Sequence, residues 1–312
     1  MSCLRIVHET TYRYKEPVRF GPHRLVLRPR EGHDLHVEEM TVQISPDYDL
    51  EWSRDVFGNS VATAYFFSPA NVLSIKSTLL LHQTNSFPRR SDRPAQSPRY
   101  PLEFSPLEET VAGAWLVSTF PADAGRVATW LDGELDARSF VDAEALAAAV
   151  NQKVRSTIAY RRREEKGVQS PAETRSIGSG SCRDLAALLL EGWRALGFPA
   201  RFASGYLDCA ASEAGRASTH AWAEVYLPEV GWIGFDPTLG TLTSSQHVVT
   251  GVSNHPRGVM PVSGTFYGER TLFSGMEVSV RTRRVEPQKS GNAEGAGIFR
   301  LPSFKIARAS AL

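Results

Sequence analysis

The segment GSGSCRDLAALLLEGW, residues 178–193, decides how the rest of the chain is interpreted. A flexible Gly/Ser stretch ends at Cys182, where a run of good helix-forming residues begins. One helical face is predicted to consist of Leu185, Leu189, Trp193 and Leu196. Gly197 and then Pro199 are typical of a helix end. We therefore expect a helix from about residue 182 to 196 with a cysteine at its N-terminus.

Three strands are predicted after this helix. PARFASGYL (199–207) is predicted to be a strand. In THAWAEVYL (219–227) the residues alternate between two faces, with His220 and Trp222 on one of them. The turn PEVG (228–231) leads into WIGFDPT (232–238), which Pro237 ends. A helix followed by three successive strands favours an α+β domain in which the helix packs on an antiparallel sheet.

The first part of the chain, residues 1–82, is predicted to be a β-rich domain. In LRIVHETTYRY (4–14), Ile6, His8, Thr10 and Tyr12 share one face of an alternating pattern. Turn signals are expected at EPVRFGP (16–22), RPREGHD (28–34), SPDYD (45–49) and FGNS (57–60). Short strands spaced in this way predict a small β-sandwich or open barrel.

The remaining segments complete the expected domain organisation. Residues 83–106, rich in Pro, Arg and Ser, are predicted to be a linker, and 107–285 the core with its following strands. Within 107–158, helical faces are predicted at Val127, Trp130 and Leu131 and at Leu146, Val150, Val154 and Ile158. Asp142 or Ser139 is expected to cap the second of these helices. Residues 286–312 are expected to form a loose tail.

Composition excludes several classes of protein. A formal net charge of +1 over 312 residues argues against nucleic-acid binding. The apolar runs are too short to span a bilayer, and the first residues lack the apolar run of a secretion signal. We therefore expect a cytoplasmic protein without a membrane partner. Three widely spaced cysteines without a CxxC motif argue against a disulfide framework or structural zinc site.

Three residue types with complementary chemistry lie on the predicted helix and strands. Unpaired N–H groups and the dipole at a helix start favour the thiolate of Cys182, the nucleophilic form. His220 lies early in one strand and Asp236 at the end of the next, and antiparallel pairing brings these two positions together. Asp236 is then expected to accept the Nδ1–H of His220 and fix its tautomer.

These segments resemble the transglutaminase-like core of bacterial proteins, within the papain-like cysteine protease superfamily. The matching positions, in four blocks, are Gly180, Cys182, Asp184 and Ala186; Gly197, Pro199, Ala200, Arg201, Gly205 and Tyr206; His220, Ala221, Trp222, Glu224 and Val225; Trp232, Asp236, Pro237 and Thr238. YRYKEPVRFGPHRLVLRPR (12–30) and DVFGN (55–59) resemble the β domain that precedes this core in many members. HVVTGVSNHPRGVMPVSGTFYG (247–268) resembles the segment that follows it, although VSNHPRGVM replaces an acidic GRDYADV-like run.

The resemblance spans residues 3–282 and implies a papain-like fold with Cys182 as nucleophile, His220 as general base and acid, and Asp236 as its orienting group. It implies a thioester intermediate formed on a peptide or protein substrate that carries an amide, without a cofactor. Attack by water would make the chain a protease, peptidase or amidase, and attack by an amine a transglutaminase. Tyr160 and Trp222 are candidates for oxyanion or substrate support.

Several alternatives remain open at this point. Cys182 can be an ordinary buried cysteine, and the chain can be a non-catalytic binding or scaffold protein that keeps the fold. A metal site formed by Cys182, Cys209 and His220 fits no common zinc spacing. His247 and His255 are placed where they could border the site, although spacing does not require it. The oligomeric state is not predicted.

Overall fold

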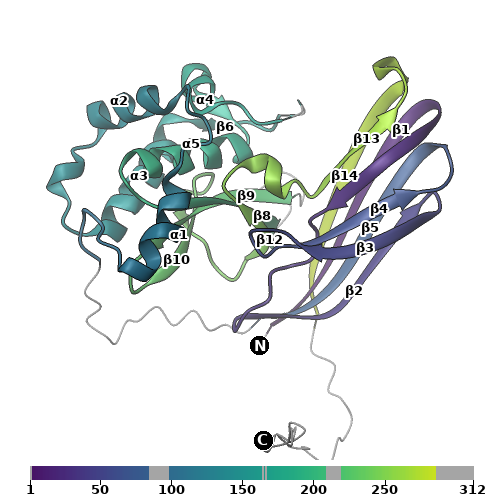
Figure 1. Cartoon of the computed structure of the whole chain (residues 1–312), viewed down its shortest axis with the longest axis horizontal. Coiled ribbons are helices and arrows are strands. Elements are labelled where there is room, and N and C mark those ends of the chain that lie inside the picture. Colours follow the sequence, from purple (N-terminus) through teal and green to yellow (C-terminus); the bar gives the residue numbers. More distant parts are fainter. Residues whose placement is uncertain (1, 84–97, 164, 166, 209–218, 286–312) are drawn as a thin grey trace, which may run out of the picture.

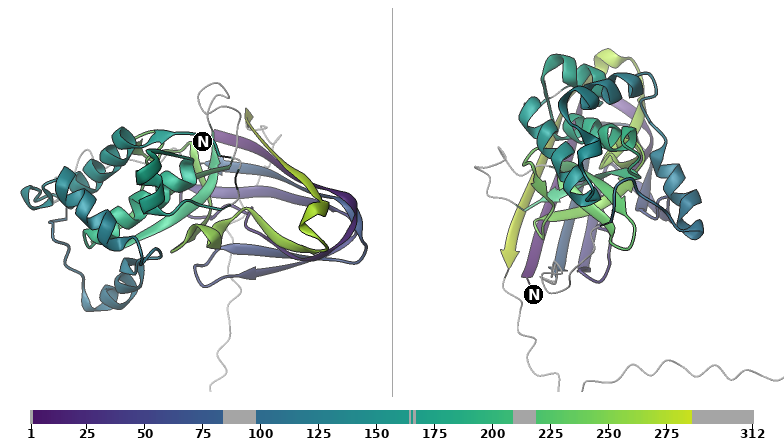
Figure 2. Two further views of the ribbon diagram at one scale, coloured as in Figure 1. Left: turned by 90° about the horizontal axis from the view of Figure 1, so that it is seen from above. Right: turned by 90° about the vertical axis from the view of Figure 1, so that its left-hand side faces the viewer.

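The structure is a computed structural model that describes residues 2–83, 98–163, 165, 167–208 and 219–285. A curled antiparallel sheet stands beside a core of helices packed on a second sheet (Figure 1). Seen from above, the two parts again lie side by side, and seen from the side of the core, its helices lie in front of the sheet (Figure 2, left and right). The expected α+β class is confirmed. None of the helices in these ranges combines the length and apolar character needed to cross a bilayer.

The first sheet begins with five strands: β1 (Ser2–Leu25), β2 (Leu35–Ser45), β3 (Tyr48–Arg54), β4 (Ser60–Phe66) and β5 (Ala70–Gln83). Their order in the sheet is β2-β5-β1-β4-β3. The expected alternation is present, because Ile6, His8 and Thr10 are buried. The turn expected at residues 16–22 lies instead inside β1, where the pairing with β5 shifts register between Arg13 and Val18. One long strand thus bends there and changes partners.

Two strands from the end of the described chain complete this sheet. β13 (Val262–Tyr267) and β14 (Phe273–Val285) both pair with β1 in antiparallel register, for example Leu4 with Arg284. The sequence-based division grouped these strands with the core, whereas their backbone partners lie in the first sheet. Both ends of the described chain therefore build the same sheet.

The predicted linker is only partly described, because residues 84–97 lie outside the described residues, as does the expected tail at 286–312. Residues 98–105 lie against the core. Tyr100 stacks on Phe198 with ring centroids 5.5 Å apart, and its hydroxyl donates to the Leu196 carbonyl. This end of the predicted linker is thus packed rather than free.

The core begins with helices α1 (Pro106–Leu116), α2 (Ala124–Glu134) and α3 (Ala143–Thr157), with the short 3-10 helix Ala137–Ser139 before α3. The Asp142 carboxylate accepts the Ala145 N–H and caps α3, so of the two expected caps Asp142 is the one used. β6 (Ala159–Tyr160) and β7 (Ser179–Gly180) pair in parallel, and α4 (Pro171–Ile177) lies between them in sequence.

Helix α5 (Cys182–Ala195) is the centre of the core. Residues 184–194 are all buried, so the helix is enclosed on every side rather than along one stripe. Gly197, with φ of +79°, ends it in the left-handed region, as predicted. The predicted faces of α2 and α3, from Val127 to Ile158, are buried against it.

The core sheet has the order β11-β10-β9-β8-β12 and is antiparallel. Its strands are β8 (Ala200–Leu207), β9 (Thr219–Leu227), β10 (Gly231–Asp236), β11 (Thr241–Leu242) and β12 (His247–Ser253). The three predicted strands are the first three of these. Two more 3-10 helices, Pro256–Val259 and Arg270–Leu272, follow β12.

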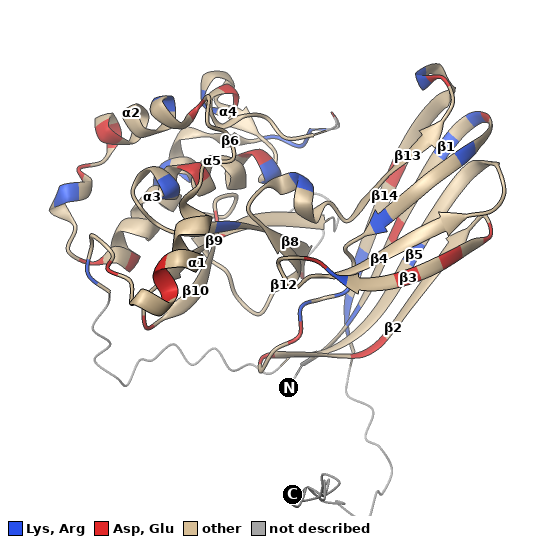
Figure 3. Ribbon diagram, viewed as in Figure 1, with Lys and Arg blue, Asp and Glu red and all other residues tan. Residues whose placement is uncertain are grey.

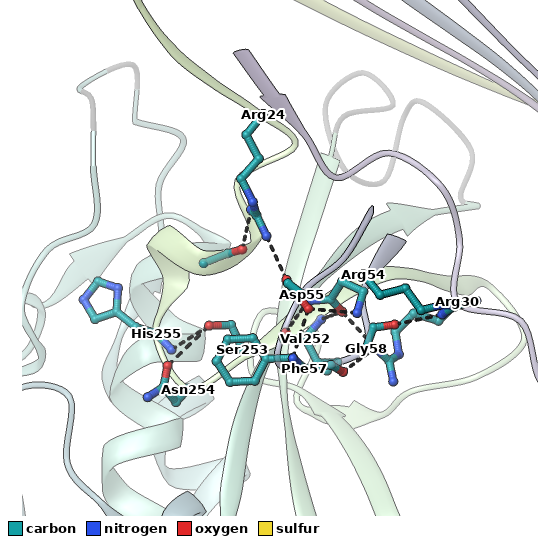
Figure 4. A network of polar contacts seen from close by, with 12 residues as sticks. Arg24, Arg30, Arg54, Asp55, Phe57, Gly58, Val252, Ser253, Asn254 and His255 are labelled. Carbon is teal, nitrogen blue, oxygen red and sulfur yellow. Dashed lines mark hydrogen bonds and ion pairs between the residues drawn. The ribbon is translucent and has the colours of Figure 1, made fainter. Parts of the chain in front are cut away.

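A polar network joins the first sheet to β12 (Figure 4). The Asn59 side chain donates to the Val252 carbonyl and accepts the Val252 N–H, so it pairs with the strand as a backbone would. The Asp55 carboxylate accepts hydrogen bonds from the Asn59 side-chain amide and from Nη2 of Arg24. Nη1 of Arg24 donates to the Gly258 carbonyl. This network fixes β12 against the first sheet.

Charged residues of both signs occur on the first sheet and on the core (Figure 3). This distribution agrees with the formal net charge of +1.

Candidate active site

Cys182 is the first residue of α5 and is half-buried. At this position a backbone N–H has no partner within the helix, so the thiol lies beside donors that suit a negative charge. Ser181 is the N-cap, and it forms a capping box with Asp184. The helix start is thus held by its own side chains, as the Gly/Ser-to-cysteine junction suggested.

Asp184 organises the turn that carries Cys182. It is fully buried, and it accepts the backbone N–H and hydroxyl of Ser181 at 2.8 and 2.7 Å. It also accepts the Gln169 N–H and forms an ion pair with Arg163 at 2.9 Å. A charge buried in this way is stabilised by pairing. Asp184 therefore connects the segment 163–169 to the start of α5.

The two glycines before the cysteine have different structural roles. Gly178 has φ of +71° and ends α4 in the left-handed region. A Cβ on Gly180 would lie 2.7 Å from the Cβ of Asp184, so this glycine allows the turn to approach its own helix. Close packing of the turn therefore explains the glycine at position 180.

His220 lies between Cys182 and Asp236. Its Nε2 is 2.6 Å from Oδ2 of Asp236, and Cys182 is close enough to help raise the pKa of the imidazole. The expected contact between His220 and Asp236 is therefore present, but through Nε2 instead of Nδ1. With Nε2 engaged by Asp236, Nδ1 is the ring nitrogen available to the sulfur.

The electrostatics of this pair favour a charged histidine. Burial alone would lower the pKa of His220, but hydrogen bonds to Asp236 and Cys182, and the charges on both, raise it to about 10. Burial alone would raise the pKa of Asp236, but hydrogen bonds from His220 and from His247 hold it well below its usual range. Imidazolium and carboxylate are therefore both stable at neutral pH.

His247, which the sequence analysis placed only as a residue that could border the site, contacts Asp236 as well. Its Nε2 is 3.1 Å from Oδ2, the same oxygen that His220 contacts. Oδ1 accepts the backbone N–H groups of Thr238 at 2.8 Å and Leu239 at 3.4 Å. A histidine at the start of HVVTGVS (247–253), shortly after the DPT block, is the signal that could have found it.

Tyr160 and Trp222 are both near these groups. Burial raises the pKa of Tyr160, with the charges of Cys182 and Asp236 adding to the effect and Arg162 opposing it, so its hydroxyl lies in their electrostatic range. Its side chain is 43% exposed, which leaves it accessible from solvent. The Trp222 ring is fully buried, with its centroid 6.2 Å from that of His220 and 5.2 Å from that of His247. It packs beside the two imidazoles and does not reach solvent.

Two groups of potential metal ligands lie close together among the described residues. His220, Asp236 and His247 have ligand atoms within 4.8 Å of one another, but hydrogen bonds between them already satisfy these atoms. Cys3, Glu38 and His82 form a second close group in the first sheet, where Glu38 and His82 form an ion pair at 2.5 Å. Cys209 of the alternative Cys/His site lies outside the described residues.

Comparison with known proteins gives two family matches and several relatives. Residues 4–81 match the bacterial transglutaminase-like N-terminal region, and residues 136–237 match the transglutaminase-like superfamily. An uncharacterized protein of Mycobacterium tuberculosis is 26% identical over 281 residues, which are 84% of this chain and 87% of that protein. One of Mycobacterium leprae is 24% identical over 284 residues, which are 86% of this chain and 94% of that protein.

A solved structure shares the fold. The crystal structure of a protein from Cytophaga hutchinsonii, provisionally assigned as a cysteine protease, matches with a TM-score of 0.69. The match covers 92% of this chain and 91% of that chain at 17% identity. At this identity the likeness concerns the fold, which includes both the curled sheet and the core.

Proposed function

Because this chain joins a bacterial transglutaminase-like N-terminal region to a core of the transglutaminase-like superfamily, we propose that it is a cysteine-dependent enzyme that cleaves amide bonds through a thioester. The observation that carries the proposal is the position of His220, which is hydrogen-bonded to Asp236 and lies close enough to Cys182 for the sulfur to raise the pKa of the imidazole. A buried cysteine with only a packing role does not need such a partner.

The first step would begin from an ion pair. With a pKa of about 10, His220 keeps its proton at neutral pH and stabilises the Cys182 thiolate beside it. The sulfur attacks the amide carbonyl carbon, and the carbonyl π electrons move to oxygen. Backbone N–H groups at the start of α5 and the Tyr160 hydroxyl are the groups available to stabilise that oxyanion.

Collapse of this intermediate breaks the C–N bond. His220 donates its proton to the leaving nitrogen, which departs as an amine, and the acyl group remains on Cys182 as a thioester. Neutral His220 then takes a proton from the acceptor as it attacks the thioester, and the thiolate leaves. Asp236 keeps the imidazole oriented through both steps, since its carboxylate is fully buried and held at both oxygens.

We take water as the acceptor, which makes the enzyme a peptidase or amidase. Cys182 is half-buried and Tyr160 is 43% exposed, so the reacting sulfur is within reach of solvent. A transglutaminase must exclude water to favour an amine. Acyl transfer to an amine is the other outcome that the same intermediate allows.

Thiol labelling tests the nucleophile. Iodoacetamide near neutral pH should alkylate Cys182 far faster than Cys3, which is only 5% exposed and whose thiol pKa is raised mainly by burial. The substitution His220→Ala should slow labelling of Cys182 and leave Cys3 unchanged. Equal labelling of the two cysteines in the unmodified protein would contradict the proposal.

A substrate screen then tests the reaction. Peptide and glutamine-donor libraries are incubated with the protein, with and without a primary amine, and Cys182→Ala serves as the control. Hydrolysis that disappears in the control supports the proposal, and amine incorporation in its place shows acyl transfer. A Cys182→Ala protein that keeps every measurable activity would instead support the binding or scaffold role.

A further inference from the structure

His247 contacts the same oxygen of Asp236 as His220 does. Its side chain is 3% exposed, its ring packs on Trp222, and its ring centroid is 6.1 Å from that of His220. No step of the proposed reaction uses it. A second buried imidazole on the carboxylate that orients the base therefore needs its own explanation.

The hydrogen bonds of His247 determine which nitrogen carries its proton. The Ser244 backbone N–H donates to Nδ1 at 3.1 Å, so Nδ1 presents a lone pair. In this tautomer Nε2 carries the hydrogen and donates to Oδ2 of Asp236 at 3.1 Å. His247 is thus a fixed donor to the carboxylate.

Oδ2 of Asp236 consequently receives two imidazole N–H groups. The backbone N–H groups of Thr238 and Leu239 hold Oδ1, so the carboxylate plane stays anchored even without His247. A donor removed from Oδ2 would therefore leave more negative charge facing His220. Hydrogen bonding to the charged form of an acid stabilises that form, and the share taken by one donor is lost to the other.

We propose, on the basis of the function proposed above, that His247 is a positioning residue that shares the charge of Asp236 with His220 and so moderates the basicity of the catalytic histidine. An imidazolium held too tightly is a poor acid for the leaving nitrogen. The hydrogen bond from His247 weakens the interaction between Asp236 and the His220 imidazolium, and it also keeps the carboxylate ionised.

The first sheet places His247 at this carboxylate. The Gln83 side chain, at the end of β5, donates to the carbonyl of Ser245 at 2.9 Å, two residues before His247. Further along β12, the Arg30 N–H donates to the Val249 carbonyl at 2.8 Å. Both contacts come from the N-terminal region. This region thus contributes to the site by fixing the strand that carries His247.

The titratable groups around Asp236 come from four elements. They are His220 on β9, His247 on β12, Tyr160 on β6 and Cys182 on α5. Among these, His247 contacts the carboxylate without contacting Cys182. Its replacement therefore changes how the charge of Asp236 is shared between hydrogen-bond donors, and it removes no contact of the reacting sulfur.

The test is the pH dependence of Cys182 alkylation by iodoacetate, which needs no substrate. The rate rises as the thiolate–imidazolium pair forms and falls as His220 loses its proton, because the anionic reagent is attracted by the imidazolium. His247→Leu removes the donor to Asp236, and His247→Gln retains an N–H donor at a similar reach. His255→Leu is the matched control: His255 Nδ1 also accepts a backbone N–H, from Arg257 at 3.0 Å, but His255 is not bonded to Asp236.

We expect His247→Leu to move the alkaline fall of the profile upward by about one pH unit, the size of one lost hydrogen bond to a charged group. His247→Gln should restore the original position, and His255→Leu should not move it. Gln83→Ala, outside the site, should give a smaller shift in the same direction. If His247→Leu does not fold, Gln83→Ala carries the test.

An unshifted alkaline fall in the folded His247→Leu protein, or an equal shift in His255→Leu, would overturn the inference. If His247→Leu does not fold, an unshifted Gln83→Ala profile would overturn it. If His247→Leu shifts and Gln83→Ala does not, the role assigned to the first sheet is wrong. Failure of the proposed function looks different, because Cys182 of the unmodified protein would then show no selective labelling.

Discussion

His8 gives a sharp prediction about how the two parts of the molecule are held together. It is buried on β1, with Nδ1 3.1 Å from the Tyr206 hydroxyl of β8 and Nε2 3.0 Å from the Thr10 hydroxyl. Burial lowers its pKa from 6.5 to about 4, with no charged neighbour to offset the effect. The contact joins the first sheet to the strand whose Gly205 pairs with His220.

The sign and size of the effect follow from linkage. Because the folded pKa of His8 lies below its ordinary value, the unfolded chain binds the proton more readily, and stability falls as the pH drops through this interval. The gap between 6.5 and about 4 is roughly 2.5 units, which at about 1.36 kcal/mol per unit corresponds to about 3 kcal/mol. The loss should reach about 2 kcal/mol at pH 5.

Urea unfolding of the unmodified protein and of His8→Gln at pH 7.5, 5 and 4 measures this effect. Glutamine keeps a polar group for both hydroxyls but does not titrate. The unmodified protein should lose about 3 kcal/mol more than the variant between pH 7.5 and 4. The difference between the two proteins removes the contribution of every other titrating group. Parallel pH dependence of the two free energies would refute the argument.

Three further substitutions test the packing around the site, each by urea unfolding. Gly205→Ala places a Cβ 1.9 Å from a β12 carbonyl oxygen, so it should separate β8 from β12, with a cost of about 3 kcal/mol or more and a loss of Cys182 reactivity. Asn59→Ala leaves the backbone of Val252 without its side-chain partner and should cost roughly 3 kcal/mol. Arg194→Leu leaves Glu191 as a buried charge without its ion pair, 2.8 Å away in the native protein, and should cost about 4 kcal/mol. Unfolding free energies unchanged by these substitutions would contradict the contacts on which they are based.

Local patterns were sufficient for much of the core. The helix that starts at Cys182, the three strands after it and the cap at Asp142 depend on residues close together in sequence. The contact between His220 and Asp236 could also be predicted, because the two strands are joined by a tight turn that fixes their register. The buried stripe from Leu146 to Ile158 follows from helical spacing alone.

Other features depended on segments far apart in the chain. The turn signals at residues 16–22 describe local preference, but β1 remains extended there because it has strand partners on both sides of the bend. The ion pair between Arg163 and Asp184 likewise depends on the packing of a loop against a helix start. Neither position carries a sequence signal for its partner.

The sequence by itself determined the helix that starts at Cys182, the three strands after it and the proximity of His220 to Asp236, because periodicity and chain order restrict short-range geometry. The position of Cys182 beside this pair was implied only by the family resemblance. Only the tertiary structure decided that Nε2 of His220 faces Asp236, that His247 shares that carboxylate, and that β14 returns to β1. A ring orientation and a partner more than two hundred residues away are set by packing and by the strand edges left open after the rest of the chain has folded. Those are properties of the assembled structure, and no single segment of the chain determines them.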